Sequence, residues 1–120
     1  MEWKRIWWKG NIIYELINGN GKVKEYNESD ILVFEGEYKN GKRNGKCKEY
    51  NTTGILIFEG EYLNGKKNGK GKEYFYGGRL KFEGEYLNGK KWNGKVMEYN
   101  YDGKKLIGEA DYREGKKFNK

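Results

Sequence analysis

Hydrophobic and polar residues alternate along most of this chain in short runs, and the same run returns at a fixed interval. The run F-E-G-E-Y begins at Phe34, at Phe58 and at Phe82, so that each step is 24 residues. Alternation with a period of two is typical of β-strands. A fixed interval of this size is typical of a repeat array, so we expect an extended molecule rather than a globular domain with one central core.

The central unit predicts a β-hairpin whose two faces differ chemically. One face carries Leu56, Phe58, Gly60 and Tyr62, and the other carries Ile57, Glu59, Glu61 and Leu63. The upstream segment Gly45–Tyr50 also alternates, residues 51–54 (N-T-T-G) have turn chemistry, and residues 64–68 are expected to turn into the next hairpin.

A four-residue turn in this hairpin fixes an expected register. It places Cys47 opposite Phe58 and Lys46 opposite Glu59, while Lys72 lies on the other side of Glu59. Cross-strand pairs of opposite charge then form a Glu–Lys lattice on one face, and rings occupy the other. Gly60 stands between two rings of its own strand, so we expect that its missing side chain leaves a slot for a neighbouring ring.

We predict an all-β fold, an elongated single-layer antiparallel β-meander of stacked hairpins with about ten strands. No segment has helical periodicity. The predicted strands are Asn11–Leu16, Gly21–Tyr26, Ile31–Tyr38, Gly45–Tyr50, Ile55–Tyr62, Gly69–Tyr74, Arg79–Tyr86, Gly94–Tyr99, Lys105–Tyr112 and Gly115–Phe118.

The chain is expected to be a single repeat domain with irregular ends. Residues 1–20 form a degenerate N-terminal cap, residues 21–104 the regular repeats and residues 105–120 a degenerate C-terminal repeat. The Trp and Ile residues from Trp7 to Leu16 are expected to cap the stack. Trp92 is an insertion in the polar turn 88–93, where it either folds over the sheet edge or is an exposed contact residue.

Composition adds a basic balance to this picture. The net charge of +7 suits an anionic membrane or an acidic protein, or serves solubility alone, whereas the alternating glutamates argue against nucleic acid. A single cysteine cannot form an internal disulfide, and no apolar run is long enough to span a membrane. We expect a cytoplasmic protein, with the periphery of a membrane or the cytoskeleton as alternative locations.

The sequence contains few candidates for catalytic residues. The chain contains no histidine, which removes the commonest base and metal ligand. Cys47 takes the place that Val23 holds in a sister repeat, so we expect a packing residue rather than a nucleophile. The paired glutamates of each repeat face lysines, which favours ion pairs over a carboxylate site. We therefore expect no enzyme, cofactor, metal or small-molecule substrate.

The residues F-E-G-E-Y-L-N-G-K from Phe58, followed by N-G-K-G-K-E-Y from Asn68, resemble the MORN repeat, the membrane occupation and recognition nexus motif. The likeness runs from about Trp8 to Tyr112, with tyrosine at a position where the family often has tryptophan. It implies an elongated single-layer sheet and roles in protein scaffolding, in binding a partner helix, in self-association or in phospholipid association. Some bacterial relatives are labelled antitoxin-like, which makes an antitoxin-like role a weaker alternative.

Two functional interpretations follow, and both are non-enzymatic. In the first, an aromatic and glycine groove binds a peptide, helix or tail of another protein, and the same rings can also pack on one another. Its expected partner-binding residues are Phe34, Tyr38, Phe58, Tyr62, Phe82, Tyr86 and Trp92. In the alternative, turn cations bind anionic lipid head groups. Its expected residues are Lys42, Arg43, Lys66, Lys67, Lys90 and Lys91.

Overall fold

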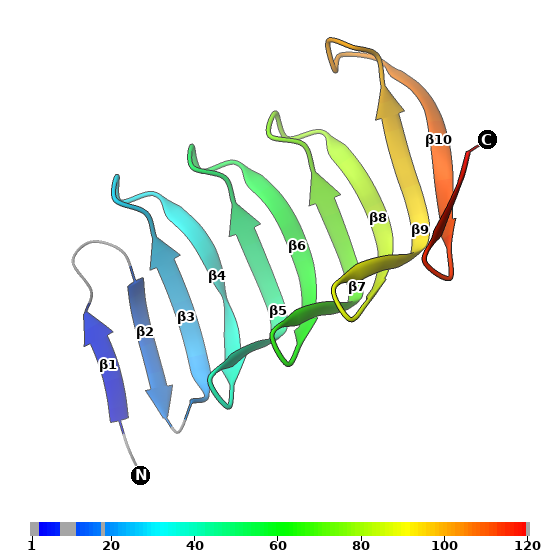
Figure 1. Ribbon diagram of the computed structural model, residues 1–120. Helices are drawn as coiled ribbons and strands as arrows, with labels where there is room; N and C mark the ends of the chain where they lie inside the picture. The colour runs from blue at the N-terminus through cyan, green and yellow to red at the C-terminus, as the bar shows by residue number, and fades with distance from the viewer. Residues whose placement is uncertain (1–2, 8–11, 18, 120) are drawn as a thin grey trace.

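The chain forms one open antiparallel sheet in which every strand pairs with its neighbours in sequence. The computed structural model describes residues 3–7, 12–17 and 19–119. These residues contain eleven strands in the order β1 to β11 and no helix, and the two termini lie at opposite ends of the sheet (Figure 1). The Cα atoms extend over 53 × 32 × 13 Å. The predicted all-β meander of hairpins is confirmed.

The strands follow the predicted segments but are longer at one end. Their bounds are β1 Trp3–Trp7, β2 Ile12–Ile17, β3 Gly21–Tyr26, β4 Leu32–Lys39, β5 Lys42–Tyr50, β6 Leu56–Leu63, β7 Lys66–Tyr74, β8 Leu80–Leu87, β9 Lys90–Tyr99, β10 Leu106–Arg113 and β11 Lys116–Asn119. Strand β1 was not predicted, because the run W-K-R-I-W does not follow the repeat pattern; it pairs with β2 from Trp3↔Ile17 to Trp7↔Ile13. Residues 8–11 of the expected cap lie outside the described residues.

The turns along one edge of the sheet are shorter than expected. Asn64 and Gly65 both have positive φ angles, 50° and 85°, and form a two-residue turn of the type that Asn-Gly favours in hairpins. Strand β7 therefore starts at Lys66 and not at Gly69, and the predicted turn 64–68 is corrected. The same holds at Asn88, so that Trp92 lies within β9 rather than in a turn.

The register differs from the prediction by two residues. Cys47 pairs with Gly60 instead of Phe58, and Glu59 pairs with Lys48 instead of Lys46, while the predicted pairing of Glu59 with Lys72 is confirmed. The loop of this turn contains three residues, 52–54, instead of the expected four, because Asn51 N–H donates to the Ile55 carbonyl at 2.8 Å. This shortening moves the register by one residue. A bulge after Glu49 adds the second residue. A shift of two leaves each side chain on its predicted face.

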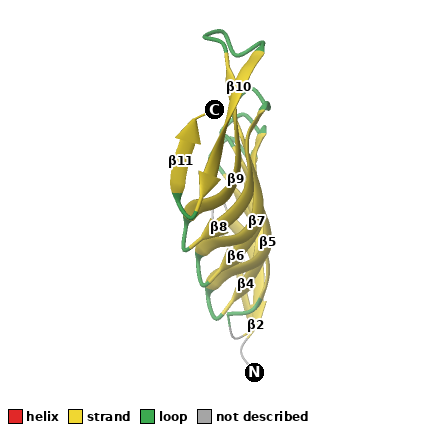
Figure 2. Ribbon diagram, turned by 90° about the vertical axis from the view of Figure 1, so that its right-hand side faces the viewer, coloured by secondary structure: helices red, strands yellow, loops and turns green. Residues whose placement is uncertain are grey.

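The Asn-Gly hairpin tips fold over one face of the sheet. The first residues of β5, β7 and β9 cross in front of the strands before them (Figure 1), and the tips curl to one side in the view along the sheet (Figure 2). Successive tips are joined by hydrogen bonds, since Gly65 N donates to the Arg43 carbonyl and Gly89 N to the Lys67 carbonyl, each at 2.8 Å. Each tip therefore covers the base of its own repeat and supports the next tip.

A continuous core lies between the sheet and these tips. Its largest fully buried rings are Phe34, Phe58 and Phe82, each at most 1% exposed. Tyr62 and Tyr86 pack edge-to-face against Phe58, with ring centroids 5.9 and 5.5 Å from it. The core is spread along the repeats rather than gathered at one centre, as expected of an array, and the folded tips supply a partial second layer.

Candidate functional site

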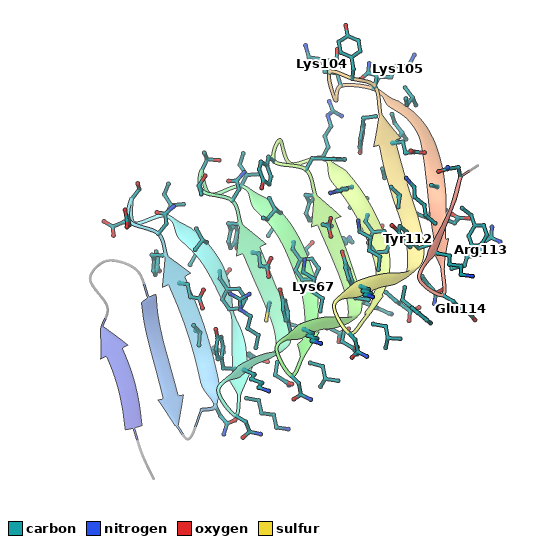
Figure 3. All side chains as sticks on the ribbon, in the orientation of Figure 1. Lys67, Lys104, Lys105, Tyr112, Arg113 and Glu114 are labelled. Carbon is teal, nitrogen blue, oxygen red and sulfur yellow. The ribbon has the colours of Figure 1, made fainter. Side chains whose placement is uncertain are left out.

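Cations from the hairpin tips cover the aromatic face. The Arg43 guanidinium lies 3.8 Å from the centroid of the Phe34 ring, and Lys67 Nζ lies 4.1 Å from that of Phe58. Lys91 Nζ takes the same place over Phe82 at 5.4 Å. Figure 3 shows Lys67 at the edge of the sheet where the tips fold over, and Lys104 and Lys105 at the opposite edge. Contacts of this kind contribute about 0.5–2 kcal/mol each, so the cations stabilise the closed face.

Three glutamates complete this closed face. The Tyr86 hydroxyl donates to the Glu73 carboxylate at 2.8 Å, and Lys91 forms an ion pair with the same carboxylate at 3.6 Å. Burial raises the pKa of Glu73, but the Tyr86 hydrogen bond and the nearby lysines outweigh it and leave that pKa lowered. Burial and the Glu73 carboxylate raise the pKa of the Tyr86 hydroxyl. The ring, the carboxylate and the cation therefore hold one another inside the repeat.

The preceding repeats have the same arrangement. Tyr62 donates to Glu49, and Tyr38 donates to Glu25 at 3.0 Å. Arg43 bridges two repeats, because its guanidinium reaches Glu25 at 3.3 Å and Glu49 at 3.4 Å. These glutamates were not predicted as part of the site, although their alternation along each strand already placed them on the aromatic face.

The predicted aromatic groove is filled by the protein itself. Five of its rings are buried, and Tyr38 packs against them as a half-buried neighbour. The expectation that Phe34, Tyr38, Phe58, Tyr62, Phe82 and Tyr86 line an open surface is therefore corrected: they form the core. Trp92 is half-buried and lies against the last tip, where a Cβ at Gly115 would be 3.1 Å from its ring. A partner contact by Trp92 stays a prediction.

The six cations of the lipid interpretation separate into two groups. Arg43, Lys67 and Lys91 turn inward over the rings, so they are corrected to core-covering residues. Lys42, Lys66 and Lys90 remain exposed on the tips. Leu63 and Leu87 are also exposed there, at 50% and 41%, and pair with Lys66 and Lys90. Neither of these leucines was predicted to be an exposed apolar residue on the tips.

The opposite face, which we call the Glu–Lys face, carries two parallel rows of charged side chains. Neighbouring strands pair residues of opposite charge all along the first, the Lys48 row: Lys24, Glu35, Lys48, Glu59, Lys72, Glu83 and Lys95. The second, the Lys46 row, lies two residues away along each strand and contains Lys22, Glu37, Lys46, Glu61, Lys70 and Glu85. The predicted lattice of glutamate and lysine is thus present, in the corrected register.

A groove of about 1000 Å³ runs between these two rows from β3 to β8. Its floor is formed by the small residues between the rows, which include Cys47, Gly60 and Gly71. The Cys47 side chain is buried among the rings of the other face, so the floor itself is largely backbone. This groove is an open concavity, and it lies on the face opposite to the predicted one.

Most glutamates of the groove already have a partner within the protein. Tyr50 and Tyr74 donate their hydroxyls to Glu35 and Glu59, each at 2.8 Å. Burial and the acceptor carboxylate raise the pKa of each of these tyrosines to about 12. Glu61 accepts a hydrogen bond from the Lys70 backbone N–H at 2.9 Å.

The lysines of the two rows have far fewer partners within the protein than these glutamates have. Within the described residues, Lys72 pairs with Glu83 at 3.7 Å, and no other lysine of the two rows forms an ion pair. Lys46, Lys48 and Lys70 are exposed. The groove charges therefore alternate in sign, and the lysines are the ones that mostly lack a partner within the described residues.

The repeat that builds this groove also matches a known family. Residues 34–55 and 58–78 match the family model of the MORN repeat. These two segments of the chain are MORN repeats. No curated protein sequence matches it significantly.

The described residues carry few of the usual features of a metal site or a reactive thiol. No group of three or more His, Cys, Asp or Glu side chains in residues 19–119 is placed to hold a metal ion. No helix of the described residues is long and apolar enough to cross a membrane. Cys47 is 3% exposed, and burial raises the pKa of its thiol, which opposes nucleophilic use. Its predicted packing role is confirmed.

Proposed function

We propose that this protein is a non-enzymatic scaffold that holds a segment of another protein in the groove of the Glu–Lys face. The groove carries this proposal: it is open, spans β3 to β8 and is lined by lysines that have few partners within the protein. The aromatic face cannot take this role without opening, because tip cations and tyrosine–glutamate pairs close it.

The size and chemistry of the groove support a peptide-like occupant. Long lysine and glutamate side chains offer methylene stems to apolar groups and charged ends to polar ones. A volume of about 1000 Å³ is at the upper end of small-molecule pockets, but the groove is an open trough along the array rather than a closed cavity. Such a shape suits a chain segment that crosses several strands.

A second candidate function is binding to an anionic membrane through the hairpin tips. The specific observation is that exposed Lys66 and Lys90 stand beside exposed Leu63 and Leu87. A lysine near an anionic surface contributes about 1 kcal/mol, and the leucines would add apolar contact. Three lysines and two leucines give a weaker surface than the continuous groove.

Photo-crosslinking separates the two functions. We would place a photoreactive phenylalanine at Lys48 in the groove, at Lys70 in the groove, or at Lys66 on a tip, and irradiate each variant in cells. The proposal predicts adducts with a protein from Lys48 and Lys70 that excess unlabelled protein removes, and none of these adducts from Lys66. Competition by Lys48→Gln/Lys72→Gln protein should be weaker than competition by Lys66→Gln/Lys90→Gln protein, which loses the same charge.

The opposite pattern of adducts would contradict the proposal. Lipid adducts from Lys66, together with the absence of protein adducts from Lys48 and Lys70, would contradict groove binding and establish the tips as the functional surface.

A further inference from the structure

The groove lysines recur at a spacing that selects one backbone conformation of a bound segment. In the Lys48 row, Lys24, Lys48, Lys72 and Lys95 lie on β3, β5, β7 and β9, with one glutamate-bearing strand between each pair. Because neighbouring strands lie about 4.8 Å apart, these lysines follow one another at about 9.6 Å. The four lysines thus span about 29 Å, from β3 at one end of the groove to β9 just beyond its other end.

A polyproline II helix matches this spacing. It rises about 3.1 Å per residue with three residues per turn, so every third side chain points the same way at about 9.3 Å. An α-helix brings side chains back to one face after seven residues at about 10.5 Å, which accumulates a mismatch of about 3 Å over three steps. A β-strand repeats on one face at about 6.7 or 13.4 Å, and neither distance fits.

The alternation of the charges selects a segment with carboxylates at the lysine spacing and neutral residues between them, because glutamates that accept tyrosine hydroxyls keep their negative charge. Glu35 and Glu59 already accept tyrosine hydroxyls, and Glu83 is paired with Lys72. Lys24 and Lys48 are exposed and form no ion pair within the described residues. The chain as a whole carries a net charge of +7, which also favours the approach of an acidic partner.

Tyrosine rings lie beside the Lys48 row, as polyproline II recognition requires. Tyr50 and Tyr74 are half-buried, follow Lys48 and Lys72 by two residues on the same strands, and are held by their hydrogen bonds to Glu35 and Glu59. Equivalent residues recur with the 24-residue period, so these rings share the spacing of the lysines. Aromatic rings that flank a groove are the usual surface on which prolines pack.

We propose that the groove binds an acidic polyproline II segment with a carboxylate at every third residue, in register with the repeats. This inference rests on the proposed function and specifies its partner class. Each carboxylate meets one lysine of the Lys48 row, and the intervening prolines lie on the groove floor and against Tyr50 and Tyr74. One repeat of the protein, which is two strands wide, then matches one turn of the polyproline II helix in length.

The test uses a dye-labelled peptide of four Pro-Pro-Glu units, whose outer carboxylates are about 28 Å apart along the axis. A permuted peptide of the same composition has its glutamates at positions 2, 6, 7 and 12, and a helical peptide carries four glutamates at every seventh residue. Fluorescence anisotropy should show that the regular peptide binds about tenfold more tightly than either, since misplaced carboxylates lose several of their contacts with the lysines. Lys48→Gln/Lys72→Gln should weaken it about fivefold or more, and Lys66→Gln/Lys90→Gln should not.

Equal binding of the regular and permuted peptides, or preference for the helical peptide, would overturn this inference and leave groove binding intact. Absence of binding by all three peptides would also overturn it. In that case protein adducts from a photoreactive residue at Lys48 would still support the proposed function, and their absence would contradict both.

Discussion

Replacing Phe58 with alanine should lower the free energy of unfolding by about 3–5 kcal/mol, the usual cost of removing a fully buried ring. Phe58 is 1% exposed, packs edge-to-face against Tyr62 and Tyr86, and lies under the Lys67 ammonium. Its removal leaves a cavity below a cation that has lost its ring. Urea unfolding followed by tryptophan fluorescence would measure the change.

Tyr101→Ala is the matched control for this prediction. Tyr101 is fully exposed, so the loss of its ring should change the free energy of unfolding by no more than about 0.5 kcal/mol. Equal effects of the two substitutions would show that Phe58 is not part of a core, and would restore the open aromatic surface that the sequence suggested.

A valine at Gly60 should destabilise the protein by about 1–3 kcal/mol or more, the range for overpacking. A Cβ at this position would lie 2.6 Å from the Lys70 carbonyl oxygen and 2.7 Å from Gly71 Cα. It would also lie 2.9 Å from the Phe58 ring, so the predicted conflict with a ring is real, but the neighbouring backbone dominates. The two strands cannot keep their spacing at this pair.

Gly77→Val provides the comparison, because a Cβ at Gly77 has no atom within 4 Å. We expect the thermal midpoint of Gly77→Val to stay close to that of the unmodified protein and that of Gly60→Val to fall. An unchanged midpoint for Gly60→Val would refute the close approach of β6 and β7 at Gly60.

The sequence predicted correctly which residues share each face of the sheet, because alternate side chains of a strand point to opposite faces and an even shift of register does not change this. The register error at Cys47 was two residues, caused by the turn-closing bond from Asn51 and by the bulge after Glu49. An even shift keeps Cys47 on the aromatic face and Glu59 on the Glu–Lys face. The packing role of Cys47 therefore survived an incorrect choice of its partner.

The alternation of side chains along each strand did not reveal which face of the sheet carries the open groove. The location of the groove depends on the tips, where Arg43 and Lys67 extend over rings of their own face. The lipid interpretation requires the turn cations to be exposed to solvent, although long cationic side chains often cover apolar surface. The sequence does contain a signal for this arrangement. Arg43, Lys67 and Lys91 recur with the 24-residue period, each two residues after a glycine, and Glu25, Glu49 and Glu73 alternate in step with the rings of the aromatic face.

Thiol labelling tests most directly whether the aromatic face is closed and the Glu–Lys face open. In the folded protein, Cys47 should react with a thiol reagent at least about a hundredfold more slowly than in denaturant, because the face must open by about 3 kcal/mol or more to expose it. In Cys47→Val/Lys48→Cys protein, where valine repeats the choice at Val23, the thiol one residue away should react nearly as fast folded as unfolded. Fast labelling of Cys47 together with slow labelling at position 48 would contradict the assignment of the two faces.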